Sequence, residues 1–199
     1  MIHSTAEVSG DAAIGEGVSI WQHVHVGKGA SVGSYSIIGC GAYIGPGVVI
    51  GDRCKVQNYA LVYEPAVVAD GVFIGPAVVF TNDRHPRAVN PDGSLKTSAD
   101  WDPVGVTVSE GASIGAGAVC VAPIVIGRWA LVAAGAVVTR DVPDFAIVAG
   151  SPARHIGWAG PAGHSLIPVS GSADEFSCPS TGARFRLAGP ETLVEVTDP

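Results

Sequence analysis

Charged residues are scarce in this sequence, and basic residues are the scarcer kind. Asp, Glu, Lys and Arg make up 15% of the 199 residues, and 11 Lys and Arg stand against 18 Asp and Glu, giving a net charge of -7. Nucleic-acid binding needs clustered Lys and Arg against the phosphates, so we expect no nucleic-acid partner. Because hydrophobic residues reach 47%, intrinsic disorder is also disfavoured.

Long apolar runs and paired cysteines are missing as well. No stretch approaches the length that spans a bilayer, and no basic segment followed by an apolar one opens the chain. We therefore expect a protein without a membrane partner or a secretory signal. The four cysteines form no C-x-x-C pair, and Cys54 and Cys120 fall where side chains are expected to point inward. This pattern favours reduced thiols and a cytoplasmic location.

What the sequence has in abundance is a six-residue repeat of β-branched or large apolar residues. The repeat runs over 2–80 and resumes over 108–138. Small or apolar residues recur four places after each repeat position, so both sets point to the inner side of short strands. Glycine often follows the apolar residue, as at Gly15 and Gly27, and glycine adopts the backbone angles of a tight corner without steric cost.

A period of six predicts an all-β fold, the parallel β-helix. Three hexads close a triangular coil of eighteen residues, and twenty hexads make between six and seven coils. The resulting prism is on the order of 30 Å long. Stacking of the coils predicts one ladder through five residues, Val8, Val26, Ile44, Val62 and Phe80.

The repeat ends near residue 138, and this divides the chain. We expect residues 1–158 to form the β-helix domain, with the segment 81–105 extruded as a loop. Residues 159–199 are rich in Pro, Gly and Ser and contain two short β-like runs, Phe185–Leu187 and Thr192–Val196. These runs predict a C-terminal extension built as a short hairpin that caps the prism.

The interruption between Thr81 and Gly105 is the first place to look for function. It contains three prolines and two glycines, and a long irregular segment inside a compact domain is usually functional or disordered. Asn82 and His85 lie just beyond the last regular hexad. An imidazole titrates near neutral pH and suits a general base, so His85 is a candidate catalytic residue. The alternative is that His85 is only a polar loop residue beside a turn proline.

The hexads, together with "AAGAVVTRDVP" (133–143) and "AGSPARHIG" (149–157), resemble the left-handed β-helix acyltransferases of the hexapeptide-repeat family. The resemblance covers residues 2–158. It implies left-handed coiling, acetyl-CoA as co-substrate without a required metal, and a homotrimer with active sites between subunits.

Two further blocks narrow the resemblance. "GDRCKVQNYALVYE" (51–64) and "GVFIGPAVVFTND" (71–83) are similar to nucleotide-sugar 3-amino N-acetyltransferases, which act on UDP-2-acetamido-3-amino-glucuronate or dTDP-3-amino-6-deoxyhexoses; the pair Trp21 and His25 matches them too. The resemblance implies direct transfer of an acetyl group from acetyl-CoA to the amino group of a nucleotide-linked 3-amino sugar.

The same resemblance implies roles for single residues. Asn82 would hold the acceptor amine, and Arg154 would meet a phosphate of acetyl-CoA, a pairing that suits a guanidinium. Backbone contacts to the cofactor would come from Gly117, Ala134 and Ala149. The residues that match the sugar-binding block are Lys55, Gln57, Asn58, Tyr63, Glu64 and His25.

Several alternatives stay open. His85-Pro86 also matches the catalytic His-Pro of maltose- and galactoside-type sugar O-acetyltransferases, so His85 would then act on a hydroxyl acceptor. A γ-class carbonic anhydrase shares the prism but needs three metal-binding histidines, and the loop offers only His85. A β-helix without catalytic activity is the remaining alternative. Outward polar residues such as Lys55 and Gln57 can also be simply solvated.

Overall fold

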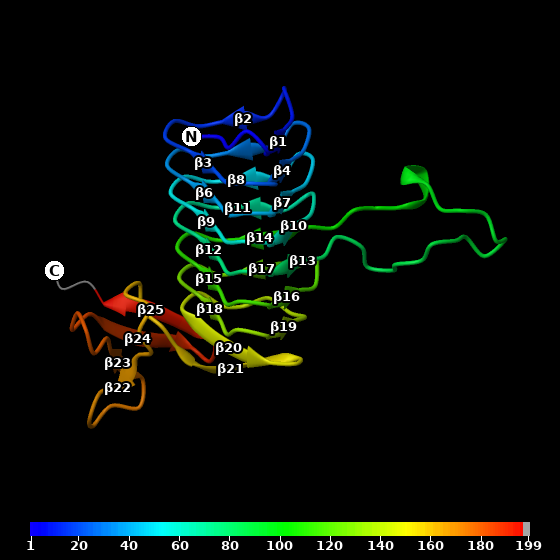
Figure 1. The fold of residues 1–199 in the computed structure, drawn as a ribbon. Coiled ribbons are helices and arrows are strands. Elements are labelled where there is room, and N and C mark those ends of the chain that lie inside the picture. The colour runs from blue at the N-terminus through cyan, green and yellow to red at the C-terminus, as the bar shows by residue number, and fades with distance from the viewer. Residues whose placement is uncertain (197–199) are drawn as a thin grey trace.

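The computed structural model describes residues 1–196, and most of them form a left-handed parallel β-helix with three sheets as its walls (Figure 1). The strands of the seven-stranded sheet are β1 (Glu7–Val8), β4 (His25–Val26), β7 (Tyr43–Ile44), β10 (Leu61–Val62), β13 (Val79–Phe80), β16 (Val119–Cys120) and β19 (Val137–Val138). The six-stranded sheet holds β2 (Ala13–Ile14), β5 (Ser31–Val32), β8 (Val49–Ile50), β11 (Val67–Val68), β14 (Val106–Val108) and β17 (Ile124–Ile126).

The third wall is an eight-stranded sheet. Its strands are β3 (Ser19–Ile20), β6 (Ile37–Ile38), β9 (Lys55–Val56), β12 (Phe73–Ile74), β15 (Ser113–Ile114), β18 (Leu131–Val132), β20 (Ala146–Gly150) and β21 (Ala153–Trp158). All neighbours in the three walls pair in parallel except β20 and β21, which form an antiparallel pair at the C-terminal end of the prism.

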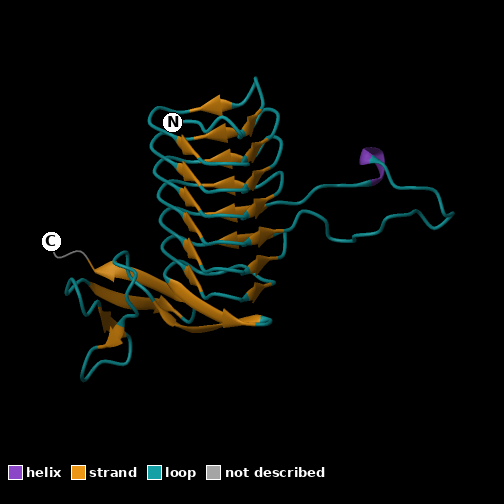
Figure 2. Ribbon diagram, in the orientation of Figure 1, coloured by secondary structure: helices purple, strands orange, loops and turns teal. Residues whose placement is uncertain are grey.

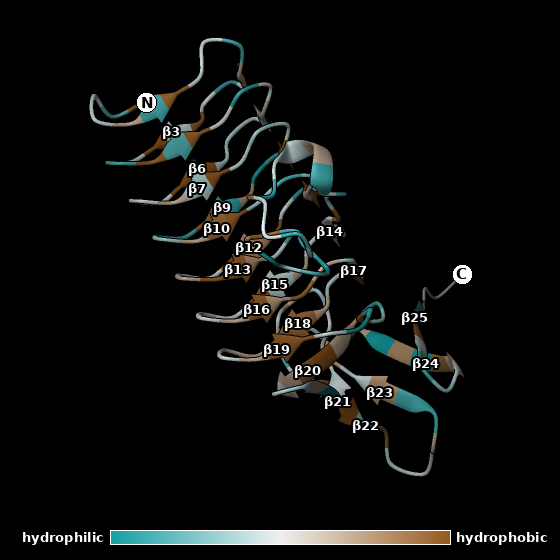
Figure 3. Ribbon diagram, turned by 90° about the vertical axis from the view of Figure 1, so that its right-hand side faces the viewer, coloured by the Kyte–Doolittle hydropathy of each residue, from teal (hydrophilic) through white to brown (hydrophobic). Residues whose placement is uncertain are grey.

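The predicted core ladder is confirmed. Val8 pairs with Val26, Val26 with Ile44, Ile44 with Val62, and Val62 with Phe80, each 18 residues further on. Seen from the loop side, hydrophobic strands repeat from coil to coil with paler turns between them (Figure 3). Burial of these side chains on the prism axis supplies the main driving force for the fold.

The inward positions of two cysteines are also confirmed. Cys54 and Cys120 are both buried in the core and free of disulfides. Burial raises the pKa of the Cys120 thiol to about 12, so this side chain serves as a small hydrophobic residue.

The turns between strands stack into three edges, which we name here. The loop edge joins the seven- to the six-stranded sheet and includes turns 27–30, 45–48 and 63–66. The aspartate edge joins the six- to the eight-stranded sheet through turns such as 33–36, 51–54 and 69–72. The tryptophan edge joins the eight- to the seven-stranded sheet through turns 21–24, 39–42, 57–60, 75–78, 115–118 and 133–136.

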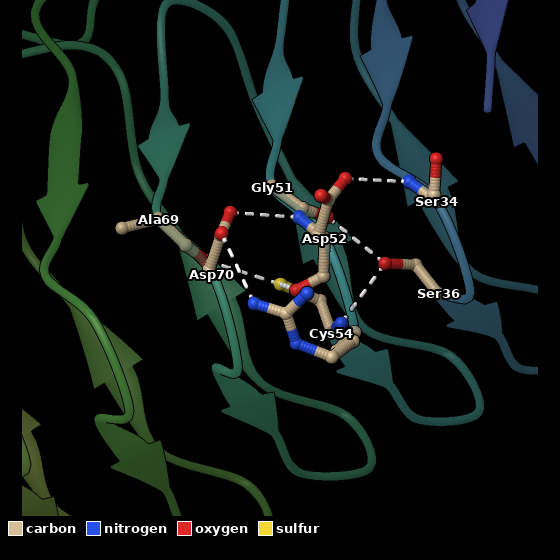
Figure 4. A network of polar contacts seen from close by, with 8 residues as sticks. Ser34, Ser36, Gly51, Asp52, Cys54, Ala69 and Asp70 are labelled. Atoms are coloured by element: carbon tan, nitrogen blue, oxygen red, sulfur yellow. Dashed lines mark hydrogen bonds and ion pairs between the residues drawn. The ribbon is translucent and has the colours of Figure 1, made fainter.

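Carboxylates hold the aspartate edge together (Figure 4). The amide of Ser34 donates to Asp52 Oδ1 at 2.7 Å, and the amide of Asp52 donates to Asp70 Oδ1 at 2.9 Å. Asp70 also accepts from the guanidinium of Arg53 at 3.3 Å. Each carboxylate therefore accepts a hydrogen bond from a turn amide of the preceding coil, and this amide would otherwise lack an acceptor.

The loop 81–105 is an insertion that leaves the register of the wall intact. Val79 pairs with Val119, 40 residues later, whereas Leu61 pairs with Val79 at the usual 18, so the loop coil carries 22 extra residues. The loop extends far from the prism (Figure 1) and contains a single 3-10 turn, η1 (Ser98–Asp100), which is purple in Figure 2. No helix of residues 1–196 is long and apolar enough to cross a membrane.

The C-terminal extension is larger than the sequence predicts. The expected hairpin exists as β24 (Arg184–Gly189) and β25 (Thr192–Val196), but it belongs to a four-stranded antiparallel sheet with β22 (Ile167–Pro168) and β23 (Glu175–Ser177). This sheet packs beside the last coils through Phe185, whose ring meets Phe145 edge-on at 5.5 Å. The expected end of the prism domain at residue 158 coincides with the last residue of β21.

Candidate functional site

The two ends of the loop meet at one point of the loop edge. The amide of Val104 donates to the carbonyl oxygen of Asn82 at 3.0 Å. Gly105 then passes close over the preceding coil, because a Cβ there would lie 2.7 Å from the carbonyl oxygen of Pro65. Asn82 is half-buried in this neck. Since Glu64 precedes Asn82 by 18 residues, it lies one coil nearer the N-terminus on the same edge.

Glu64 carries a buried side-chain oxygen, Oε2, that makes no hydrogen bond within the described residues. The carboxylate lies over Gly45, in the adjacent coil on the N-terminal side, where a Cβ would collide with Oε2. A buried carboxylate oxygen without a donor is costly, on the order of 1–3 kcal/mol or more. Such an atom marks a place where a ligand that donates hydrogen bonds is expected.

A row of aromatic side chains lies beside Glu64 on the outer face of the seven-stranded sheet. His25 stacks on Tyr43 at 5.2 Å between ring centroids, and Tyr43 contacts Tyr63 at 5.1 Å. Burial raises the pKa of Tyr43, and the neighbouring Glu64 and Tyr63 raise it further. At the outer end of the row, His25 Nδ1 lies 3.5 Å from a carboxylate oxygen of Glu7. Tyr43 thus separates His25 from Tyr63 in a single row, and Glu64 lies beside this row.

His85 lies further out on the loop. Its backbone amide donates to Asp83 Oδ1 at 2.7 Å, and its side chain is exposed. It lines a hollow within the loop together with Arg84, Lys96 and Trp101, whose indole N–H is buried without a partner among the described residues. The hydrogen bond to Asp83 therefore holds the backbone of His85 in a short turn, three residues after Asn82. The imidazole ring is exposed to solvent.

The side chains of the tryptophan edge become smaller toward the C-terminal end of the prism. Small residues occupy its C-terminal half, at Gly75, Gly115 and Ala116, and at Ala133 and Ala134. Gly117 and Ala134 are exposed there, so the backbone of the edge is accessible. A thin, flexible ligand can run along such a surface and hydrogen-bond to main-chain groups.

Arg154 and Ala149 lie where this edge reaches the C-terminal end of the prism. They face one another across the antiparallel pair β20–β21. The guanidinium of Arg154 donates to the carbonyl of Ala153 at 2.9 Å. Together with Arg140 and His155, Arg154 lines a hollow at the C-terminal end of the prism. Asp141 and Glu191 line the same hollow, so its two guanidiniums are balanced by two carboxylates.

The substrate-binding residues expected from the sequence are divided between two edges. Tyr63 and Glu64 lie at the loop edge, whereas Gln57 and Asn58 lie at the tryptophan edge. Lys55 is exposed on the outer face of the eight-stranded sheet, paired with Ile37 and Phe73 in the neighbouring coils. Within one chain, these residues do not form a single pocket.

Two participants escaped the sequence reasoning, namely Tyr43 and Gly45. Both lie in the coil that precedes the coil of Glu64, and the 18-residue period alone was enough to place them there. Among residues 1–196, no group of three or more His, Cys, Asp and Glu side chains is arranged to hold a metal ion.

Comparison with known proteins agrees with the repeat. Residues 11–46 and 29–64 match the family model described as bacterial transferase hexapeptide (six repeats). A dTDP-3-amino-3,6-dideoxy-alpha-D-galactopyranose 3-N-acetyltransferase from Aneurinibacillus thermoaerophilus is 57% identical over 51 residues, which is 26% of this chain and 27% of that protein. The bifunctional protein GlmU of Synechococcus sp. (strain RCC307) is 33% identical over 158 residues, 77% of this chain and 34% of that protein.

Thus the chain spans about a third or less of the length of these curated relatives. Among solved structures, a point mutant of the N-acyltransferase AntD from Bacillus cereus, in complex with dTDP and coenzyme A, superposes with a TM-score of 0.50 at 21% identity over 80% of each chain. That likeness supports the fold. The repeats matched at 11–46 and 29–64, together with the three-walled prism, show that this part of the chain is built from the hexapeptide repeats described for bacterial transferases.

Proposed function

We propose that this protein transfers an acetyl group from acetyl-CoA to the amino group of a nucleotide-linked 3-amino sugar. The observation that carries the proposal is Glu64 Oε2, which is buried without a partner among residues 1–196 on the edge from which the loop leaves, one coil N-terminal to Asn82. A protonated sugar amine supplies both the hydrogen-bond donors and the positive charge that this carboxylate lacks. The similarity to a sugar 3-N-acetyltransferase supports the same acceptor.

In the proposed reaction, Glu64 and Asn82 hold the amine, and a base removes one proton from its ammonium form. In this proposal His85, on the loop, takes that proton, a role that typically contributes about 10²–10⁴-fold. The free amine then attacks the thioester carbonyl, and a C–N bond forms while the oxygen gains negative charge. A backbone N–H at a nearby turn stabilises this oxyanion. The C–S bond breaks, and the departing thiolate takes the proton that the new amide nitrogen loses.

The donor site in this proposal follows the tryptophan edge. The backbone at Gly117, Ala134 and Ala149 contacts the pantetheine arm of acetyl-CoA, and Arg154 meets a phosphate. The small residues of this edge support the placement, because they leave main-chain groups accessible. The acceptor groups lie on the loop edge, so a complete site needs the tryptophan edge of another copy. A homotrimer supplies that arrangement three times.

The test is a thiol-release assay with acetyl-CoA and a panel of UDP- and dTDP-linked amino sugars, in which the panel includes one sugar with hydroxyls only. We expect release with a 3-amino sugar. Release with the hydroxyl-only sugar, lost in His85→Ala, would establish O-acetylation instead. Full activity in both Asn82→Ala and His85→Ala would overturn the catalytic assignment. A stable monomer at assay concentration, measured by light scattering, would overturn the site between copies.

A further inference from the structure

Three turns of the aspartate edge hold a carboxylate in the same way, and Figure 4 shows two of them. A glycine opens each turn, and the amide of the next residue donates to a carboxylate of the following coil. The pairs of donor and acceptor are Ser34 and Asp52 at 2.7 Å, Asp52 and Asp70 at 2.9 Å, and Arg128 and Asp144 at 2.7 Å. The acceptor oxygen lies over the glycine, so a Cβ at Gly33, Gly51 or Gly127 would be 2.5, 2.5 or 2.6 Å from it. We call this arrangement a carboxylate-capped turn.

Turn 45–48 of the loop edge has the same arrangement except for the donor. Glu64 Oε2 lies over Gly45, and Pro46 precedes Glu64 by the same 18 residues that separate Ser34 from Asp52. Residue 46 is a proline, however, and proline has no N–H to donate. Oε2 therefore lacks the hydrogen bond of a carboxylate-capped turn, and it has no other partner among residues 1–196.

The other amides of this turn are already used. The amide of Gly45 donates to the carbonyl of Val62 at 2.9 Å, that of Gly47 to the carbonyl of Lys28 at 2.9 Å, and that of Val48 to the carbonyl of Gly45 at 3.3 Å. None of them is left for the carboxylate. The identity of residue 46 therefore decides whether Glu64 has a hydrogen-bond donor in the turn beside it.

The shape of the turn does not require proline at this position. Pro46 and Gly47 are the central residues of the turn, and Gly47 has a φ of 66°. Proline is favoured at the first central position of such turns. Yet Ser34 occupies the equivalent position before Tyr35, whose φ is 60°. Because an equivalent turn forms with a residue that keeps its N–H, turn geometry alone does not account for Pro46.

We propose that Pro46 is a positioning residue for the acceptor: it withholds an amide from Glu64 and so leaves Oε2 open to the ammonium group of the amino sugar. The inference rests on the proposed function and adds to it a residue that acts only through Glu64. A main-chain N–H at Oε2 would occupy that oxygen and offset part of the carboxylate charge. The ammonium would then have to replace an existing hydrogen bond, which lowers its affinity. With proline at residue 46, the acceptor displaces no hydrogen bond of the chain.

The first test uses the protein alone. Pro46→Ala restores an N–H beside Glu64 Oε2, and hydrogen exchange of the residue 46 amide is followed by NMR. We expect this amide to exchange roughly tenfold or more slowly than in the double variant Pro46→Ala/Glu64→Ala, because only the single variant keeps the carboxylate acceptor. Equal exchange in the two proteins would mean that the amide does not reach Oε2, and it would overturn the inference.

The second test is steady-state kinetics with a nucleotide-linked 3-amino sugar. We expect Pro46→Ala to raise the KM for the sugar roughly 3- to 30-fold, while kcat and the KM for acetyl-CoA stay within about twofold. Pro46→Gly also restores the N–H and should act alike, although it adds no side chain. In chains that already carry Glu64→Gln, Pro46→Ala should not raise the KM further, because the carboxylate is gone. A role in turn shape alone would act equally in both backgrounds.

Ser34→Pro is the matched control on the aspartate edge. The two positions are packed alike, since a Cβ at Gly15 would lie 2.6 Å from the nitrogen of Ser34, and a Cβ at Gly27 would lie 2.6 Å from the nitrogen of Pro46. Ser34→Pro removes the donor of Asp52, so we expect a lower Tm and unchanged KM values. A wild-type KM in Pro46→Ala, or an equal rise in Ser34→Pro, overturns the inference. A wild-type protein that acetylates no amino sugar contradicts the proposed function itself, whereas an active wild type with an unaffected Pro46→Ala contradicts only the role of Pro46.

Discussion

Two edges of the prism carry carboxylates in equivalent stacked turns, and they use them differently. On the aspartate edge, Asp52 and Asp70 accept hydrogen bonds from turn amides of the chain itself. On the loop edge, Glu64 buries an oxygen that no group of residues 1–196 satisfies. The same repeat therefore builds a closed network on one side and an open one on the other. A closed network contributes to stability, whereas an open one reserves its interaction for a ligand.

The largest expected effect comes from Glu64→Gln. The amide keeps the shape of the side chain but removes the charge that holds an ammonium, so we expect kcat/KM to fall on the order of 10²-fold. Thermal unfolding should occur at the same or a higher temperature, because a buried charge without a partner is lost. Steady-state kinetics and calorimetry on the same preparation measure both. Unchanged kcat/KM would show that the two edges do not differ in function.

Asp52→Ala is the opposite case on the aspartate edge. The amide of Ser34 loses its acceptor, and we expect a loss of about 1–3 kcal/mol in the free energy of unfolding. In a chain of this size each kcal/mol lowers Tm by roughly 2–4 °C. The kcat of the folded protein should stay within about twofold of wild type. A large loss of kcat without a loss of stability would reverse the comparison.

Gly45→Ala tests the position of the carboxylate without touching it. The new Cβ collides with Glu64 Oε2, so the carboxylate has to move. We expect kcat/KM to fall about tenfold, less than for Glu64→Gln because the charge remains. The two changes share one contact, so their effects in the double variant should be less than additive. Full additivity in this double-mutant cycle would argue against a shared mechanism, and Gly10→Ala, where a Cβ meets nothing within 4 Å, is the control.

The smallest expected effect is on Tyr43. Burial is the first cause of its raised pKa and the charge of Glu64 the second, so Glu64→Gln should move this pKa part of the way down toward its usual value. The change is seen as earlier ionisation of one tyrosine in an alkaline absorbance titration. Asp70→Asn, on the other edge, should leave the titration unchanged. No difference between the two variants would place Glu64 away from Tyr43.

The prism itself was predictable from the sequence because its period is a local property. Every pair in the ladder from Val8 to Phe80 followed from counting eighteen residues, and burial of Cys54 and Cys120 came with it. The extension was only half predictable. β24 and β25 are regular strands, but β22 and β23 have two and three residues and include Pro168, so no periodic pattern marks them.

The candidate site was predictable in its residues but not in its arrangement. Glu64 and Asn82 were found through a resemblance, and their 18-residue spacing already places them in one column, but the burial of Glu64 Oε2 needed the fold. Glu64 Oε2 lies over Gly45 as Asp52 Oδ1 lies over Gly33, but the residue after Gly45 is Pro46, which has no N–H to donate, whereas Ser34 donates to Asp52. The division of Gln57 and Glu64 between two edges also needed the fold, since a seven-residue spacing crosses one whole wall of the prism.

The register between β13 and β16 has a consequence for how such a protein changes over time. In an ordinary sheet, adding one residue to a strand reverses which side chains face the core. Here the 22 additional residues leave Val79 opposite Val119, as if the chain had never left the wall. During evolution the loop at this corner can therefore gain, lose or exchange residues one at a time, and the hydrophobic core of the prism stays unchanged.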